Sequence, residues 1–277
     1  MPAKLTLRFW GVRGSTPTPL ASHLRYGGNT PCLELRTPAG HLFIFDCGTG
    51  FRKLGKTLEK ESKKKKPIKA RIFLTHYHWD HIQGIPFFTP LYQSRNQFLF
   101  HGFHFPGESM QQALEGQMAG PYFPVDMSVM AAHRHFFEIA EERIGYDDLV
   151  IATRWLNHPQ GCLGYRLECD GKVVVYATDT EPGDARADKN VRLLADGADL
   201  LIYDAQYTPE EMAAHKNWGH SNWKEGIAIA RECKVKKLVL FHHDPDRDDK
   251  GVDGILRRAR AHFPQVVAAK EGLEIKF

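Results

Sequence analysis

The chain concentrates its metal-binding side chains in the stretch Thr75-His76-Tyr77-His78-Trp79-Asp80-His81, which directly follows the apolar run Arg71-Ile72-Phe73-Leu74. Three imidazoles and a carboxylate this close together lose hydration when buried, so a bound cation is the natural way to satisfy them. Alternate side chains of an extended segment point the same way, so His76 and His78 share one direction. Asp80 and His81, just past the predicted strand, can turn towards a second point. The stretch therefore favours a loop that feeds two metal positions over a set of solvated loop histidines.

The composition is that of an ordinary soluble globular protein. The chain has 277 residues, of which 42% are hydrophobic and 25% are charged, and no apolar run approaches the roughly 20 residues that span a bilayer. Apolar segments are spread evenly without a long linker, so we expect a single domain over residues 1–277. The N-terminal residues run directly into an alternating segment without an apolar leader, so we expect a cytoplasmic protein.

The cysteines and the net charge argue against several classes of protein. The five cysteines are odd in number, widely spaced and without a C-x-x-C pair, so neither a disulfide framework nor a structural zinc knot is expected. The net charge of +4 is small for this length, and the run Lys63–Lys66 is typical of a solvated loop. A dispersed charge excess supplies no element that reads bases, so nucleic-acid binding has little support.

The order of segments predicts a β-meander followed by a β/α alternation. Strands are expected at Leu5–Trp10, Cys32–Arg36, His41–Asp46, Arg71–Thr75, Asp199–Tyr203 and Lys237–Phe241, at an apolar segment Gln97–Phe100, and in a segment from Ile151 to His158. A hairpin of Cys162–Glu168 and Lys172–Ala177 is expected around an Asp-Gly turn. Helices are expected at Phe51–Lys60, near Ser109–Met118, and at Val191–Ala195, Trp223–Cys233 and Gly254–His262.

Polar residues end one apolar strand after another. They are Asp46, His76, Asp179, Asp204 and His242. Functional sites of α/β architectures gather where the carboxyl ends of strands meet loops, because the sheet holds these loops rigidly. The pattern therefore predicts that these five residues share one rim of the fold.

The ordered series of metal-binding residues resembles a known family. The histidine loop, a lone His158, Asp179 after one strand and His242 after a later strand resemble the metal motifs of the metallo-β-lactamase superfamily, over nearly the whole chain. The run Phe45-Asp46-Cys47-Gly48-Thr49-Gly50 resembles the turn before the metal loop in its ribonuclease Z and cyclic-phosphodiesterase branch. The resemblance implies an α/β fold of the αββα sandwich type, with a two-metal site at one edge.

The resemblance also implies a ligand set. One metal would be held by His76, His78 and His158, a second by Asp80, His81 and His242, and Asp179 would bridge them. His243 is adjacent to His242, but alternation turns only one of them inward, and the motif favours His242. Taken alone, His158 would be a turn residue and Asp179 a helix N-cap. The imidazole-rich set suits zinc best, while carboxylates at two positions leave manganese or iron open.

Two divalent ions can share a bridging hydroxide, lower its pKa and clamp the oxygens of a phosphoryl displacement. The resemblance therefore implies a dinuclear metal-dependent phosphodiesterase acting on a small phosphodiester, with cyclic nucleotides among the candidates. It also implies that Asp80 is a catalytic residue as well as a metal ligand. The segments Asp204-Ala205-Gln206 and Gly219-His220-Ser221 resemble the pair that ribonuclease Z-like enzymes place beside the metals. They imply that His220 protonates the leaving alkoxide and that Asp204 orients it.

This second match is partial. Gln206 and Asn222 stand where the family usually has threonines, and His220 would in the alternative merely cap the helix starting near Asn222. Ribonuclease Z proper grips tRNA with an arm inserted between the lone histidine and the bridging aspartate. Only twenty residues separate His158 from Asp179, and they read as a tight hairpin, so tRNA is not the expected substrate.

The extra length lies in residues 84–150, which we expect to form a lid or insertion over the site. Its Tyr122 and Phe123 either stack a base or form the core of the insertion. The alternatives that remain open are a tRNA 3′-processing endonuclease, a lactone or thioester hydrolase on the same fold, and a binding protein that keeps the fold without metal. A homodimer is compatible with the superfamily, but the sequence shows no interface stripe.

Overall fold

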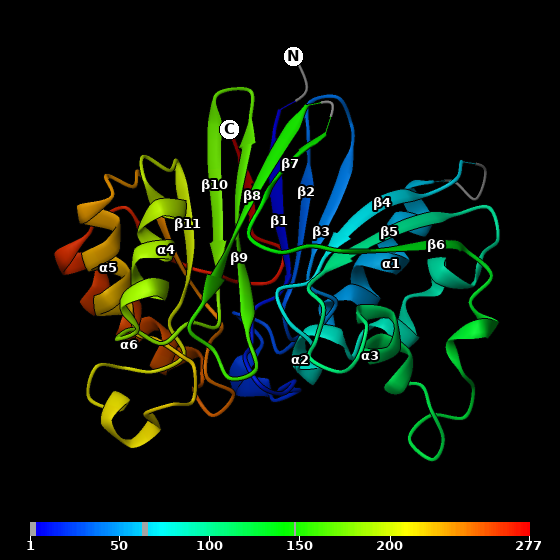
Figure 1. Ribbon diagram of the computed structural model, residues 1–277. Coiled ribbons are helices and arrows are strands. Elements are labelled where there is room, and N and C mark those ends of the chain that lie inside the picture. Colours follow the sequence, from blue (N-terminus) through cyan, green and yellow to red (C-terminus); the bar gives the residue numbers. More distant parts are fainter. Residues whose placement is uncertain (1–3, 63–65, 147) are drawn as a thin grey trace.

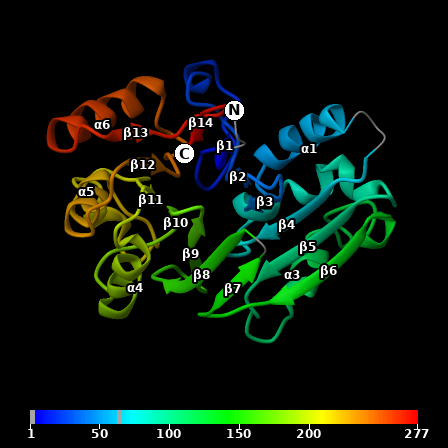
Figure 2. The same ribbon diagram turned by 90° about the horizontal axis from the view of Figure 1, so that it is seen from above.

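A computed structural model describes residues 4–62, 66–146 and 148–277, so Lys63 to Lys65 of the basic run lie outside the described residues. Two β-sheets pack face to face, and helices cover their outer faces (Figure 1, Figure 2). The αββα sandwich predicted from the sequence is thereby confirmed.

Each sheet has seven strands within the described residues. The order in the first sheet is β14 (Glu274–Lys276), β1 (Thr6–Gly11), β2 (Cys32–Arg36), β3 (Leu42–Phe45), β4 (Lys69–Phe73), β5 (Gln97–Gly102) and β6 (His133–Glu138). The order in the second is β13 (Val266–Ala268), β12 (Leu238–Phe241), β11 (Leu200–Asp204), β10 (Lys172–Ala177), β9 (Cys162–Cys169), β8 (Leu149–Leu156) and β7 (Arg143–Tyr146). Strands β3 to β6 are parallel, and so are β10 to β13.

The helices bury one face each. They are α1 (Gly50–Glu61), α2 (Trp79–Ile82), α3 (Met110–Gly116), α4 (Ala185–Ala195), α5 (Trp223–Glu232) and α6 (Asp249–His262), with short 3₁₀ turns η1 (Ala21–His23), η2 (Ile85–Phe87), η3 (Thr89–Tyr92), η4 (Met127–Val129) and η5 (Met212–His215). Helices α1 and α3 cover the first sheet, while α4, α5 and α6 cover the second (Figure 2). In α1 the buried side chains are Phe51, Leu54 and Leu58, the spacing of an amphipathic helix.

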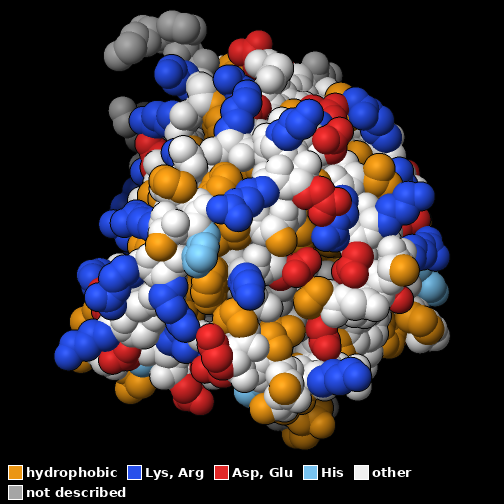
Figure 3. All heavy atoms as spheres, turned by 90° about the vertical axis from the view of Figure 1, so that its left-hand side faces the viewer, with side chains coloured by type: hydrophobic (Ala, Val, Ile, Leu, Met, Phe, Trp, Pro, Cys, Tyr) orange, Lys and Arg blue, Asp and Glu red, His pale blue; other side chains and the backbone are white. Residues whose placement is uncertain are grey.

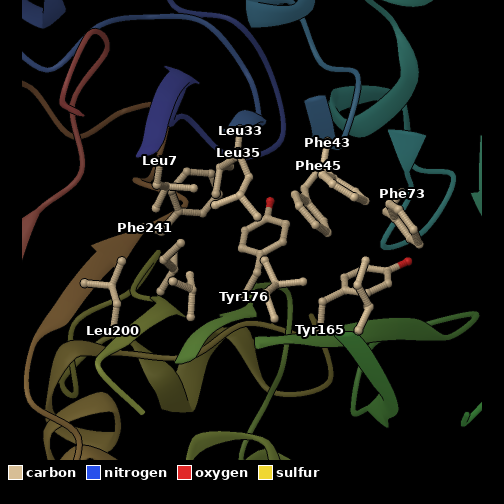
Figure 4. Close-up of a cluster of buried hydrophobic side chains, with 14 of the residues drawn as sticks. Leu7, Leu33, Leu35, Phe43, Phe45, Phe73, Tyr165, Tyr176, Leu200 and Phe241 are labelled. Atoms are coloured by element: carbon tan, nitrogen blue, oxygen red, sulfur yellow. The ribbon is translucent and has the colours of Figure 1, made fainter. Parts of the chain in front are cut away.

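The two sheets meet through an aromatic-rich core, shown in Figure 4. Phe45 at the end of β3 lies with its ring centroid 5.5 Å from that of Phe73 and 5.5 Å from that of Tyr165 across the sandwich. Replacing such a buried phenylalanine by alanine typically costs about 3–5 kcal/mol of stability. This packing therefore fixes the ends of the strands from which the polar residues emerge.

Parallel pairing brings those ends to one edge. Phe45 pairs with Phe73 in the first sheet, and Asp204 pairs with Phe241 in the second. The residues that follow these positions consequently leave the sheets side by side, as the sequence pattern predicted.

Element boundaries differ from the prediction where polar residues begin a helix. Helix α4 begins at Ala185 instead of Val191, and α6 begins at Asp249 instead of Gly254. The side chain of Asp184 accepts a hydrogen bond from the backbone N–H of Ala187 and caps α4; Asp248 caps α6 in the same way through Gly251. The polar first turns carry no hydrophobic periodicity, so the pattern showed only the buried remainder. Strands β6, β7 and β14, which are largely exposed, and β13, which has only three residues, were not predicted because none of them shows a long alternating pattern.

Other sequence-based expectations concern thiols and membranes. The five cysteines are all buried and free. Among the described residues no helix is long and apolar enough to cross a membrane.

A buried histidine couples this core to pH. His101 of β5 is 6% exposed, and its ring stacks on Phe73 with centroids 4.3 Å apart. Its Nε2 accepts a hydrogen bond of 2.9 Å from the Tyr146 hydroxyl. Burial lowers the pKa of His101 to about 4, so the folded chain holds this ring neutral.

We predict that His101 makes the fold acid-sensitive. The unfolded chain binds a proton at this ring below a pKa of about 6.5, whereas the folded chain binds it only near a pKa of about 4. The stability that the neutral ring contributes is therefore complete above the unfolded pKa and is lost as the pH falls towards the folded pKa. Between pH 7 and pH 5 the expected loss is about 2 kcal/mol. In urea unfolding at constant metal loading, His101→Phe should lose less stability than wild type over this interval. Equal losses in the two proteins would contradict the prediction.

Candidate metal centre

The seven predicted metal-binding residues lie together at the edge where β4, β8, β10 and β12 end. Their donor atoms form two sets within the described residues: His76, His78 and His158 in the first, and Asp80, His81, Asp179 and His242 in the second. Within each set these atoms lie within 4.8 Å of one another. Four separate loops thus bring their side chains to one point.

The first set is made of three imidazoles. His158 Nε2 lies 3.1 Å from His78 Nδ1. Asp179 Oδ1 lies 3.9 Å from His158 Nε2 and 4.0 Å from His76 Nε2. The carboxylate of Asp179 therefore faces this set although it belongs to the second.

The second set is tighter. His81 Nε2 and His242 Nε2 are 3.3 Å apart. Asp80 Oδ2 lies 3.3 Å from the first and 3.2 Å from the second of these nitrogens. Asp179 places Oδ2 3.5 Å from His81 Nε2 and Oδ1 3.3 Å from His242 Nε2. Its two oxygens therefore stand between the sets, as expected of a bridging ligand.

Hydrogen bonds on the far side of each ring fix which nitrogen faces inward in the second set. His81 Nδ1 lies 2.8 Å from Asp46 Oδ2, and a carboxylate only accepts, so Nδ1 carries the proton. His242 Nδ1 donates in the same way to Gln206 Oε1 at 2.8 Å. Both Nε2 atoms therefore face each other and two carboxylates, so any cation that binds here is contacted by all four side chains.

The first set is oriented by the same device. His158 Nδ1 donates to the carbonyl oxygen of Gly219 at 2.8 Å, and His78 Nε2 donates to Gln160 Oε1 at 3.1 Å. His76 Nδ1 lies 3.0 Å from Thr75 Oγ1, whose own proton goes to Asp46. Partners of this kind hold metal-binding histidines in one tautomer and orientation.

The donor set fits divalent cations. His76 Nε2 is buried and has no hydrogen-bond partner among the described residues, which costs free energy unless a cation takes its lone pair. Burial alone would lower the pKa of His81, but Asp80, Asp179 and Asp46 together hold it well above its ordinary value. The cluster therefore favours positive charge at its centre, and imidazole with carboxylate is a donor set that divalent metals take.

Asp46 is the node that joins the core to this centre. It is fully buried, and it accepts hydrogen bonds from the Thr75 backbone N–H at 2.8 Å, the Tyr176 hydroxyl at 2.8 Å and His81 Nδ1. Asp46, Asp179 and His242 all have φ between 55° and 59°. Such positive-φ backbone costs about 1–3 kcal/mol for each non-glycine residue, so the fold carries strain at the strand ends that aims these side chains.

Close packing leaves room only for glycine beside two of the rings. A Cβ on Gly14 would lie 2.4 Å from His242 Nδ1, and one on Gly219 would lie 2.2 Å from His158 Nδ1. Both glycines therefore let the backbone approach the centre without displacing a donor.

His220 lies against the second set. Its Nδ1 is 2.9 Å from Asp204 Oδ2 and 3.8 Å from Asp179 Oδ1. Asp204 also accepts from the backbone N–H of Asp179 at 3.1 Å and of Ser221 at 3.0 Å. Burial would lower the pKa of His220, but the charge and hydrogen bond of Asp204 raise it to about 9. The hydrogen bond between His220 and Asp204 gives both side chains a partner. Together with Asp179 and His242 they also form a third group whose donor atoms could hold a metal ion.

Two alternatives from the sequence can be compared with this geometry. Helix α5 is capped by Asn222, whose side chain accepts from the N–H groups of Lys224 and Glu225 at 2.9 and 3.1 Å, so His220 does not serve as the cap. His243 turns away from the cluster and its Nε2 bonds to the carbonyl oxygen of Ala269 at 2.8 Å. The structure thus brings His242, and not His243, to the centre.

Sequence reasoning missed the residues that orient the rings. They are Asp46, Thr75, Gln160, Gln206 and Gly219. Asp46 had a visible signal as one of the strand-ending polar residues, and Gln206 stood in the partly matched segment. Gly219 acts through its backbone carbonyl, which no residue type reveals.

Two hollows adjoin the centre. Ser15, Asp80, Asp179 and His220 line one, and Tyr77, His78 and Trp79 line both. The larger hollow continues between α2, η2 and α3 and reaches Tyr122 and Phe123. In the stretch 84–150, β5 and β6 are strands of the first sheet and β7 of the second, while residues between 103 and 123 border this hollow.

Residues 41–243 match the Beta-lactamase superfamily domain. The chain belongs to this superfamily. The sequence-based prediction of a metal-dependent hydrolase of the superfamily is confirmed. Its similar relatives include a ribonuclease Z from Thermococcus gammatolerans, which is 28% identical over 275 residues that cover 78% of this chain and 81% of the relative.

Solved structures agree on the fold. The metallo-beta-lactamase fold protein YhfI from Bacillus subtilis superposes with a TM-score of 0.74 at 18% identity and covers 99% of this chain and 100% of that one. A diphosphatase from the PhnP family superposes with a TM-score of 0.71 at 20% identity, over 99% of this chain and 98% of that one. At these identities the likeness concerns the fold alone.

We predict that Asp46→Asn weakens metal binding without unfolding the chain. The amide keeps the shape but removes the carboxylate that fixes the His81 tautomer, and changes of this kind cost about 10–100-fold in metal affinity. Chelator competition measures the affinity, and circular dichroism checks the fold. The matched control Tyr176→Phe removes one donor to the same carboxylate and should change the affinity much less. Equal affinities of Asp46→Asn and wild type would refute the role of Asp46.

Proposed function

We propose that the chain is a dinuclear metal-dependent phosphodiesterase that hydrolyses small phosphodiesters, cyclic nucleotides among them. The observation that carries the proposal is the pair of donor sets with Asp179 between them, next to a carboxylate-bound histidine in the same hollow. Such a site offers two cations and a proton donor to one reacting phosphate.

The metals are proposed to lie one in each donor set. His76, His78 and His158 would hold the first, Asp80, His81 and His242 the second, with Asp179 shared. Zinc suits five imidazoles and two carboxylates best, and manganese or iron is the alternative. When bound, two such cations supply Lewis acidity that activates water and neutralises phosphoryl charge.

His220 is proposed as the general acid. Its Nδ1 proton is held by Asp204, so a second proton on Nε2 can pass to the leaving oxygen. Asp204 raises the pKa of His220 to about 9 against the effect of burial, which keeps the ring protonated at neutral pH. Cations nearby would bring this pKa back towards neutrality, where an acid transfers its proton best.

The size of the substrate follows from the edge around the centre. Strands β9 and β10 form a hairpin closed by Asp170 and Gly171, with no extended arm between His158 and Asp179. On the face over α4, α5 and α6, Lys and Arg side chains are mixed with Asp and Glu (Figure 3). The short hairpin offers no extended element that could grip a long polyanion, which supports a small phosphodiester.

A ribonuclease Z among the relatives is the specific observation that favours tRNA 3′-processing as a second candidate. The metal-loaded protein should turn over bis(p-nitrophenyl) phosphate or a 3′,5′- or 2′,3′-cyclic nucleotide and leave precursor tRNA uncut. Cleavage of the precursor at its 3′ end would replace the proposal by the ribonuclease. Faster turnover of lactones or thioesters than of any phosphodiester would replace it by an ester hydrolase.

We predict that His220→Ala lowers kcat for a cyclic nucleotide by about 10²–10⁴-fold at unchanged metal content, because the leaving alkoxide then lacks its proton donor. The matched control is His215→Ala on η5, whose Nδ1 donates to the backbone carbonyl oxygen of Glu211 at 2.9 Å. The control should keep its rate. A wild-type rate in His220→Ala would remove the acid role.

Asp204→Asn tests the orienting role separately. Without the carboxylate the pKa of His220 falls, so the alkaline limb of the kcat/KM profile should move to lower pH while the metal content stays at the wild-type level. An unmoved limb would show that Asp204 has only a structural role.

A further inference from the structure

The larger of the two hollows has features that the proposed phosphodiester chemistry does not use. Its volume is about 700 Å³, within the range of small-molecule sites. We call this hollow the aromatic pocket; the aromatic side chains that line it are Tyr77, Trp79, Phe87, Phe103, Phe105, Tyr122 and Phe123. It shares Tyr77, His78 and Trp79 with the hollow at the donor sets, so a molecule bound to the metals can reach into it.

Several of these rings are unusually exposed. Trp79, Phe87 and Tyr122 are 76%, 53% and 80% exposed, respectively. Large apolar side chains gathered at a concave surface usually mark a place where a ligand covers them. Flat rings on several sides favour a flat aromatic ligand, because stacking uses the whole face of both partners.

The polar groups in the aromatic pocket narrow the ligand further. Gln117 lines the pocket, and its Nε2 is buried without a hydrogen-bond partner in the part of the chain that the structure describes. Glu108 also lines the pocket, and none of the described residues that line it is a lysine or arginine. An amide donor and a carboxylate acceptor match the edge of a heteroaromatic base, whereas the carboxylate repels a second phosphate.

We propose that the aromatic pocket binds the nucleobase of a nucleotide whose phosphate lies at the donor sets. This inference rests on the proposed function and names its substrate class: small phosphodiesters that carry a nucleoside. Rings of Phe87, Tyr122 and Phe123 stack the base, and Gln117 donates to its edge. An alkyl chain would fill the same volume but would leave the Gln117 amide without a partner.

Binding to the metal-loaded protein tests the pocket directly. The probes are the 3′- and 5′-monophosphates of adenosine and guanosine, with ribose 5-phosphate as the base-free reference, measured by isothermal titration calorimetry. At least one nucleotide should bind about tenfold tighter than the reference, or more, as base stacking on aromatic rings provides. Equal affinities of all probes would overturn the proposal.

Two glycines offer a matched pair of variants. Gly116 at the end of α3 lines the aromatic pocket, and no described residue has an atom within 4 Å of a Cβ placed there. Gly254 in α6 is equally open but lies outside the pocket. Gly116→Leu should abolish the preference for nucleotides over ribose 5-phosphate and leave the affinity for the latter unchanged, whereas Gly254→Leu should keep the preference. A preference that survives Gly116→Leu would overturn the proposal.

Two further variants address the contacts. Tyr122→Ala removes a ring that is mostly in solvent and should reduce the preference several-fold without affecting the fold. Gln117→Leu removes the unpartnered amide and should reduce the preference while thermal stability does not fall, because a buried unsatisfied donor is lost. An unchanged preference in both variants would contradict the assigned contacts.

Turnover separates this inference from the proposed function. Ethyl p-nitrophenyl phosphate carries no base, so its metal-dependent hydrolysis reports on the phosphodiesterase alone. Its hydrolysis together with equal affinities for all probes would overturn the pocket and keep the phosphodiesterase. A nucleotide preference that Gly116→Leu abolishes, in a protein that hydrolyses no phosphodiester, would keep the pocket and overturn the phosphodiesterase.

Discussion

The convergence of bare imidazole and carboxylate acceptors in a buried space is the constraint on which the rest of the site depends. His81, His242 and His158 donate hydrogen bonds from their outer nitrogens to oxygens of Asp46, Gln206 and Gly219, so the inner nitrogens face carboxylates and one another. Acceptors in such contact repel unless positive charge lies between them. A cation that binds only the folded chain relieves this repulsion and adds its binding free energy to stability.

Rigid strands hold the mutually repelling imidazole and carboxylate side chains close together. Asp46 and His242 directly follow β3 and β12, and Asp179 lies two residues after the end of β10; each of the three has a left-handed backbone conformation. Interlocked aromatic rings such as Phe45 and Phe73 immobilise the strands behind them. The core therefore offsets the strain at the edge, and this explains why donors from four loops can be held within 4.8 Å in each set.

Much of the fold and of the metal centre could be predicted from the sequence because two of the signals are local. The spacing of His76, His78, Asp80 and His81 after an apolar strand fixes a metal loop, and strand-ending polar residues indicate a shared edge. The order of His158, Asp179 and His242 along the chain indicated the superfamily, and the superfamily predicted the αββα sandwich. These signals can be recognised in the sequence because they depend on residue type at fixed spacing.

What the sequence did not reveal depends on tertiary contacts. The carbonyl of Gly219 and the amide of Gln160 orient ligand rings from distant loops, and such contacts leave no periodic pattern. Edge strands such as β6 are polar and partly exposed, so alternation was too weak to mark them. The region around Tyr122 carried aromatic residues whose role was open; only the structure shows that they border the same hollow as His78.

The most direct test of the central claim is an anomalous-diffraction analysis of crystals of the metal-loaded protein, supported by elemental analysis of the same sample. The account predicts two ions per chain, one contacted by His76, His78 and His158 and the other by Asp80, His81 and His242, with Asp179 contacting both. A chain that takes up no ion, or whose ions lie away from these residues, would contradict it.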